Sequence, residues 1–418
     1  MKKFSNLLSP YQGLPREVYI IFLARVVNAI GAFVWPMMTL ILTKKIGLST
    51  SEAGFWIAVS GLLSMPASLI GGKLTDTIGR KPVLLFCEGT AVLLFGACAF
   101  VEPSMPMVYM MMGAGVFFMM ADPAHSSMIA DLTTVENRAG AYSLSYLGFN
   151  LGFAIGPIIG GMLFENHLKW FFLGDSITGL ASLALVFFFI KETIPSQNEE
   201  IKQAELESEA SEEGSILAVL FRRPLLIWFA LFALGYNFVY SQWGFLLPMH
   251  VEAMNPGEGA ALYGKLASLN GFTVILFTPL ITKGFENLRE TKKIVIGGIG
   301  YVIGFGMLGF VESKAAFILA CFIITLGEII VTISFMPFLA NHTPASHRGR
   351  MNAVLPIVMG LGFTFGPLIV GNLIPRYAIS GTWKIVAIIA IISTIAMQFL
   401  DQAEGKSSRI KKETEEIA

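Results

Sequence analysis

Four ionisable side chains stand out inside the long apolar runs of this sequence, and the carboxyl groups among them could bind protons. Glu328 lies in ITLGEIIVTISF with no basic residue near it, and Asp122 lies in the run 107–129. A carboxyl in apolar surroundings holds its proton more strongly than one in water, because burial disfavours the charged form. Ionisable groups at membrane depth are costly and mark functional sites. We therefore predict proton-coupling roles for Glu328 and Asp122, while Glu328 could also attract a cationic substrate or be a protonated packing residue.

Arg25 is the third of these side chains, and it lies in the inner half of the first apolar run. We predict that Arg25 pairs with Asp122. The pair could alternate with a protonated Asp122 during proton coupling, or it could be a static ion pair that fixes helix packing. Glu88 stands only about two turns into its run, where a structural role is expected.

Aromatic and amide side chains gather in the first, fifth and seventh apolar runs. Such groups can stack planar apolar molecules and attract cations, although helix packing and interfacial anchoring explain them equally well. The candidate substrate-binding residues are Asn28, Trp35, Tyr146, Asn150, Tyr236, Asn237, Tyr240 and Trp243.

The runs that carry these residues are long enough to cross a membrane. A bilayer core of about 30 Å needs roughly 20 apolar residues in helical form. Of the 418 residues, 54% are hydrophobic and only 14% are charged. Twelve spans are predicted, at 18–42, 54–73, 82–101, 107–129, 140–164, 170–190, 225–249, 260–281, 293–312, 315–339, 351–374 and 383–400.

The two halves of the chain repeat one pattern. Residues 152–163 and 362–373 share Gly, Phe, Gly, Pro, Ile, Gly and Leu at one constant offset. Parallel repeats of this kind are typical of transporters that rock about a central cavity. The fold class predicted is an all-α membrane protein with twelve transmembrane helices in two pseudo-symmetric six-helix bundles around that cavity. The bundles would be 1–194 and 224–418.

A polar segment separates the predicted bundles. Residues 195–215 are rich in Glu and lack aromatic side chains, which indicates a solvated cytoplasmic linker. A short amphipathic helix is expected at its end, so the linker region is 195–223. Most of the 29 Lys and Arg residues fall in alternate loops and in the tails, which predicts that both termini are cytoplasmic.

Composition argues against several other classes. The formal net charge is zero, so no nucleic-acid partner is expected. The cysteines Cys87, Cys98 and Cys321 form no CxxC pattern, and no metal site or cofactor is predicted. No Walker A pattern and no catalytic triad or HExxH arrangement is present, so the chain is not expected to be an enzyme. The first apolar run has no cleavage site and is expected to remain as a helix.

The loop after the second span reads GKLTDTIGRKP and resembles the signature loop of the major facilitator superfamily. Thr77 stands where that family usually has Arg. The resemblance implies gating roles for Gly72, Asp76, Gly79, Arg80 and Lys81. The spacing of Asp131 and Arg138 resembles the family's second gate loop, although a solvated turn is an equal alternative.

The fifth span carries glycines at a spacing of four, which lets two helix backbones approach closely. The helix-packing motif comprises Gly148, Gly152, Gly156, Pro157, Gly160 and Gly161. The stretch 152–161 resembles the motif of exporters in the drug–proton antiporter group of bacteria, whose members have twelve helices.

That resemblance implies a proton-coupled exporter of hydrophobic, cationic or neutral compounds, acting as a monomer in the bacterial inner membrane with protons and lipid as its other partners. One alternative is a lipid or glycolipid flippase of the same fold. Another is a nutrient or peptide symporter. A third, of another class, is a non-transporting receptor or scaffold.

Overall fold

The computed structural model describes residues 11–194, 223–343 and 348–417, and over these ranges it consists of helices and connecting segments without a β-strand. Ten of its helical stretches are long and apolar enough to cross a membrane. The predicted all-α membrane fold is therefore confirmed. The acidic linker and its amphipathic helix lie outside the described residues, except for Arg223.

The first six predicted spans are found as helices. Their bounds are α2 Arg16–Gly31, α3 Val34–Leu40, η2 Ile41–Lys45, α4 Thr50–Ile78, α5 Arg80–Cys98, α6 Met105–Asp131, α7 Val135–Phe153, α8 Gly156–Phe164 and α9 Leu168–Phe189. η2 is a π-helical turn that continues α3.

The later spans are found as well. Their bounds are α12 Pro224–Ser241, α13 Leu246–Met254, α14 Gly259–Gly284, α15 Glu290–Met307, α16 Lys314–His342 and α17 Arg348–Ile417. α17 contains Ala378 in a left-handed conformation with φ 55°, which marks a sharp bend between two helical parts.

The number of twelve spans stays a prediction. Two features explain why only ten helical stretches are counted as long and apolar enough to cross a membrane. α15 carries Glu290, Lys292 and Lys293 in its first turn, which makes it more polar than the other spans. α17 counts once as a continuous stretch, although the bend at Ala378 divides it into the two parts that the sequence predicts as separate spans.

Three spans are interrupted near their middle. The first breaks between α2 and α3, the fifth between α7 and α8, and the seventh between α12 and α13. Pro157 lies in the first turn of α8, where its missing N–H removes no helical hydrogen bond. At the first break, the buried carboxylate of Asp175 on α9 accepts the backbone N–H groups of Phe33 and Val34. Irregular backbone at membrane depth needs such internal partners.

The chain folds into two compact units. Unit 1 comprises 1–49, 59–200 and 247–275, and unit 2 comprises 50–58, 201–246 and 276–418. Each unit takes a short segment from the other predicted bundle, so this division does not test the predicted boundaries at 194 and 224.

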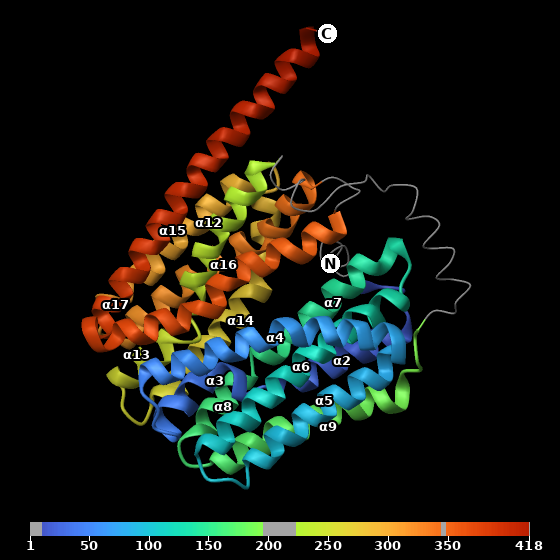
Figure 1. Ribbon diagram of the computed structural model, residues 1–418, viewed down its shortest axis with the longest axis vertical. Coiled ribbons are helices and arrows are strands. Elements are labelled where there is room, and N and C mark those ends of the chain that lie inside the picture. Colours follow the sequence, from blue (N-terminus) through green and yellow to red (C-terminus); the bar gives the residue numbers. More distant parts are fainter. Residues whose placement is uncertain (1–10, 195–222, 344–347, 418) are drawn as a thin grey trace, which may run out of the picture. The chain divides into compact units, whose positions relative to one another are not determined.

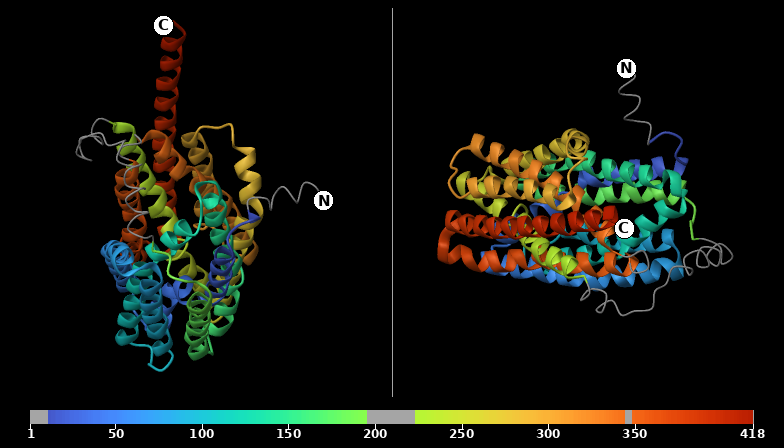
Figure 2. Two further views of the ribbon diagram at one scale, coloured as in Figure 1. Left: turned by 90° about the vertical axis from the view of Figure 1, so that its right-hand side faces the viewer. Right: turned by 90° about the horizontal axis from the view of Figure 1, so that it is seen from above.

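Within each unit, the helices pack side by side (Figure 1). In unit 1, α2 packs against α7 and α9, and α5 packs against α6 and α9. In unit 2, α12 packs against α17, and α15 packs against both α16 and α17. The end of α17 runs on past the other helices of unit 2 (Figure 2).

The predicted glycine face of the fifth span is a packing surface. A Cβ at Gly152 would lie 2.5 Å from the Cβ of Ala29 on α2, and one at Gly156 would lie 2.7 Å from the Ala29 carbonyl oxygen. Gly161 faces another helix, because its Cβ would lie 2.6 Å from the carbonyl oxygen of Ala260 on α14. Glycine is therefore required here for close contact between helix backbones.

Candidate functional site

A cavity of about 220 Å³ lies within unit 2, between α12, α15 and α16. Its lining consists of three tyrosines, an asparagine and apolar or hydroxyl side chains: Tyr236, Asn237, Tyr240, Tyr301, Val331, Thr332, Phe335 and Met336. The structure thus brings together three residues predicted from sequence as a substrate-binding group, namely Tyr236, Asn237 and Tyr240.

The tyrosines of this cavity form one aromatic cluster. The ring of Tyr301 stacks on Tyr240 with centroids 5.9 Å apart, and it lies 6.0 Å from the ring of Tyr236. Phe335 meets Tyr236 edge to face at 6.4 Å. Tyr301 is absent from the sequence-based prediction, because nothing in the α15 sequence indicates which of its faces meets α12. The glycines Gly297, Gly300 and Gly304 in the same helix are the sequence feature that could have indicated this packing face.

Glu328 stands beside this aromatic cluster. It lies one turn before Thr332 on α16 and is partly buried. The adjacent Gly327 packs directly on α15, because a Cβ there would lie 3.1 Å from Tyr301 Cδ1. The cavity lining is aromatic, and Glu328 stands one helical turn from it on α16, outside the lining residues. Aromatic faces attract organic cations.

Arg25 and Asp122 come together in unit 1, as the sequence predicts. Arg25 Nη2 lies 4.0 Å from Asp122 Oδ1, at the limit of an ion pair, and the Asp122 side chain is 57% exposed. The buried Arg25 Nε has no hydrogen-bond partner among the described residues. The pair is thus loosely held, and Arg25 has donor capacity to spare.

The remaining predicted substrate residues lie in different surroundings. Trp35 and Tyr146 are exposed, at 60% and 54%, whereas Trp243 is buried. Asn150 is buried, and its amide donates to the carbonyl of Tyr146 one turn earlier on α7. Asn28 is partly buried on α2. Their participation in one binding site with the unit 2 cavity stays a prediction.

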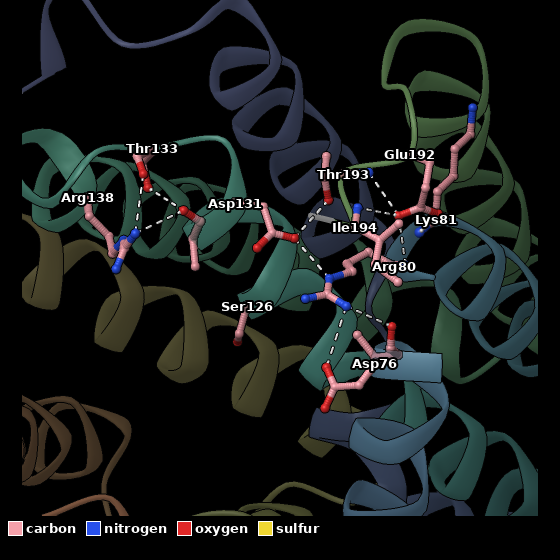
Figure 3. A network of polar contacts seen from close by, with 12 residues as sticks. Asp76, Arg80, Lys81, Ser126, Asp131, Thr133, Arg138, Glu192, Thr193 and Ile194 are labelled. Carbon is pink, nitrogen blue, oxygen red and sulfur yellow. Dashed lines mark hydrogen bonds and ion pairs between the residues drawn. The ribbon is translucent and has the colours of Figure 1, made fainter. Parts of the chain in front are cut away.

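The predicted gating loop forms a network of polar contacts in unit 1 (Figure 3). Arg80 is its buried centre: Nε lies 2.9 Å from Asp131 Oδ2, and Nη1 lies 3.5 Å from Asp76 Oδ1. Arg138 donates from Nη2 to the carbonyl oxygens of Ala130 and Thr133. The structure therefore joins the two predicted gate loops through the ion pair between Arg80 and Asp131. Two separate solvated turns would not make this contact. Gating itself stays a prediction.

Glu192 completes this network, although sequence reasoning did not select it. The segment after α9 brings its carboxylate to the start of α5, where the N–H groups of Arg80 and Lys81 donate to it at 2.9 and 3.1 Å (Figure 3). Gly79 has φ 117° and no side chain, and a Cβ there would lie 2.6 Å from Glu192 Oε2. Partial burial raises the pKa of Glu192, but backbone N–H donors, Arg80 first among them, bring that pKa below its usual value.

A second charged cluster that the sequence did not reveal lies at the other end of unit 1. Lys44 Nζ is 2.6 Å from Glu165 Oε1, after α8, and 2.6 Å from Glu252 Oε1 on α13. Lys45 also contacts Glu165, at 3.4 Å. All these side chains are between 17% and 27% exposed. One ammonium group thus links carboxylates from two distant parts of the chain.

No group of three or more His, Cys, Asp or Glu side chains suited to a metal ion occurs among the described residues. The three cysteines are free and buried.

These observations define a polytopic helical membrane protein with broken spans, close glycine packing and ionisable groups at membrane depth, the class to which secondary transporters belong. The family model of the Major Facilitator Superfamily matches residues 21–355. The chain belongs to this family.

Relatives support this assignment over nearly the whole length. The chain is 27% identical over 407 residues to the uncharacterized MFS-type transporter YttB of Bacillus subtilis, covering 95% of this chain and 98% of YttB. It is 25% identical to multidrug resistance protein 2 of the same organism, covering 86% of this chain and 89% of that protein. A crystal structure of the peptide transporter POT in complex with sulfate shares the fold, with a TM-score of 0.74 at 15% identity, covering 96% of each chain.

Proposed function

We propose that this transporter exports hydrophobic organic cations in exchange for protons, by alternating access, across the bacterial inner membrane. The single observation that carries the proposal is the cavity in unit 2, which three tyrosines line, with Glu328 one helical turn before the lining residue Thr332. Two of its wall residues, Tyr236 and Tyr240, belong to the seventh span, which was expected from sequence to bind substrate.

The chemistry of the cavity favours cations over other substrates. A ring of aromatic faces attracts an ammonium or iminium group, and a nearby carboxylate adds charge attraction. A multiply anionic solute would instead need several Arg or Lys side chains. The cavity volume of about 220 Å³ is smaller than the roughly 300–1,000 Å³ of a pocket for a drug-sized ligand. It therefore suits the charged or planar part of a larger molecule.

Proton coupling is proposed for Glu328, with Asp122 and Arg25 as a second site. A cation and a proton compete for the same carboxylate, so substrate binding at Glu328 favours proton release, and protonation favours substrate release. The direction of transport rests on the resemblance of 152–161 to the exporter motif and on the relative named multidrug resistance protein 2.

The test is efflux of a lipophilic cationic dye from energised cells, comparing wild type with Glu328→Gln, with and without a protonophore. We expect the protonophore and the substitution each to abolish efflux. Glu312→Gln is a matched control, because Glu312 is an exposed residue between α15 and α16. Tyr301→Phe should keep efflux, whereas Tyr301→Ala should weaken dye binding at least several-fold.

Other outcomes would point to the alternatives. A well-expressed wild type that moves no dye would contradict the drug proposal and favour lipid flipping or peptide symport of the same fold. Dye movement that Glu328→Gln leaves unchanged would remove Glu328 from the coupling. A non-transporting receptor would show neither dye movement nor any effect of the protonophore.

A further inference from the structure

Two buried ionisable side chains of unit 1, Glu88 and His125, have no part in the proposed function. His125 Nε2 on α6 lies 2.6 Å from Glu88 Oε1 on α5, and the two residues are only 7% and 5% exposed. A buried carboxylate is costly unless a hydrogen-bonded partner compensates it. The sequence suggested a structural role for Glu88, but it did not show this partner.

The pair lies beside the Arg25–Asp122 pair. His125 follows Asp122 by three residues on α6, so the two side chains share one face of the helix. Arg25, Glu88 and His125 each adjoin a member of one buried apolar cluster, namely Ala24, Cys87 and Ala124. Arg25 thus stands on the α2 side of the same cluster, and its Nε is a buried donor without a partner among the described residues.

The four groups can hold one shared proton without a change in their total charge. With His125 protonated, Glu88 and His125 neutralise each other, and Arg25 neutralises ionised Asp122. With the proton on Asp122 instead, Arg25 neutralises Glu88 and the imidazole is neutral. The total charge of the four side chains is therefore zero in both arrangements. Equal charge matters because an uncompensated charge is strongly disfavoured where the surroundings have a low dielectric constant.

We propose that Glu88, His125, Arg25 and Asp122 form one proton-binding centre, in which His125 and Asp122 exchange a single proton and Arg25 pairs with the carboxylate left uncompensated. The inference deepens the proposed function and rests on its assignment of Asp122 and Arg25 to proton coupling. In the exchange, imidazolium loses its Nδ1 proton and keeps Nε2–H, which continues to donate to Glu88. The proton moves to Asp122, whose side chain is 57% exposed and can exchange with water.

Other titratable groups stand on the helices that surround the centre. None of them forms an ion pair with the four members among the residues that the structure describes. They are Arg16, Glu17 and Tyr19 on α2, Glu52, Lys73 and Asp76 on α4, Arg80, Lys81, Cys87 and Cys98 on α5, Tyr109 and Asp131 on α6, Arg138, Tyr142 and Tyr146 on α7, and Lys169 and Asp175 on α9.

The test reads the protonation of His125 directly. Purified protein labelled with ¹⁵N-histidine is titrated by NMR, and the signal of His125 is identified by its loss in His125→Gln. The chain has only five histidines. In Asp122→Asn, residue 122 cannot ionise, so Arg25 should pair with Glu88 and favour neutral imidazole. The titration midpoint of His125 should then fall by about one pH unit or more, the size of effect that a close charge produces.

The matched control is Glu102→Gln, an exposed acidic residue before α6, which should leave the midpoint unchanged. Equal midpoints in wild type and Asp122→Asn would overturn the proposal. If His125→Gln does not fold, the signal is assigned by replacing the other four histidines one at a time. The titration needs no substrate, so its result is independent of the dye-efflux result. Failure of this proposal can therefore be distinguished from failure of the proposed function.

Discussion

The carboxylate of Asp175 on α9 accepts a hydrogen bond from the backbone N–H of Phe33, with a distance of 3.0 Å between N and Oδ2. The same oxygen accepts the N–H of Val34 at 3.1 Å. These donors would be without intrahelical partners at the start of α3. Gly31 and Gly174 allow α2 and α9 to come this close, because a Cβ on Gly174 would lie 2.8 Å from the ring of Phe33. A side chain of the sixth span thus stabilises the helix break in the first span.

We expect Asp175→Ala to destabilise the protein more than Asp175→Asn. Alanine leaves the buried N–H of Val34 without an acceptor, which costs about 1–3 kcal/mol, while the N–H of Phe33 keeps only the carbonyl oxygen of Gly31. Asparagine keeps an acceptor oxygen while it removes the charge. Thermal unfolding of the purified protein in detergent would measure the order, with the neighbouring Ser176→Ala as a control. Equal stability of Asp175→Ala and wild type would show that the cap contributes nothing.

Lys44→Met should destabilise unit 1 by leaving the carboxylates of Glu165 and Glu252 without their shared cation. The side chains are partly exposed, so the cost should fall between the about 0.5 kcal/mol of an exposed pair and the about 3 kcal/mol of a buried one. The triple variant Lys44→Met, Glu165→Gln, Glu252→Gln should recover most of the loss, because it removes the unpaired charges. Thermal unfolding checks both variants, and a triple variant as unstable as the single one would contradict the electrostatic cause.

Gly152→Ala should destabilise the packing of α7 on α2 by about 1–3 kcal/mol, as overpacked contacts do. The added methyl group would lie 2.5 Å from the Cβ of Ala29 and 2.7 Å from the carbonyl oxygen of Val26. Gly360→Ala is the matched control, because a Cβ there has no heavy atom within 4 Å and a helical alanine is favoured by up to about 1 kcal/mol. Unfolding temperatures that shift in the same direction would refute the packing argument.

His342, just beyond the span Lys314–Leu339, should make the stability of unit 2 depend on pH. Its hydrogen bond with Glu404 raises the pKa of the imidazole, against the opposing effect of burial. Because the folded pKa is the higher one, the pair should contribute fully below the ordinary histidine value of about 6.5 and lose its contribution as pH rises through the raised value. The effect should be at most about 1 kcal/mol.

Unfolding temperatures measured from pH 5 to pH 9 would test this dependence. In His342→Gln the decline with rising pH should flatten, because glutamine can donate a hydrogen bond to Glu404 but does not titrate. The exposed His167→Gln should retain the wild-type slope. A slope unchanged in His342→Gln would assign the pH dependence to another group.

The sequence by itself determined where the spans lie and how two of them pack. The spans follow from the length of apolar helix that a bilayer requires, which is a local property. The glycines at 148, 152, 156 and 160 also indicate a contact face directly, because their spacing places them on one side of a helix. The Arg25–Asp122 pair was predictable because these were rare charges in apolar runs.

Only the tertiary structure decided which side chains meet across helices. Asp175 lies in a run as apolar as its neighbours, and its partner is a backbone break 142 residues away. Lys44 stands 208 residues from Glu252 in the sequence. Tyr301 packs on a tyrosine of α12, although the sequence of α15 indicated only that it is a membrane span. Hydropathy indicates that a helix is buried in lipid or protein, but it does not indicate which face of the helix packs against which neighbouring helix. That choice is made by the shapes of all the packed surfaces together.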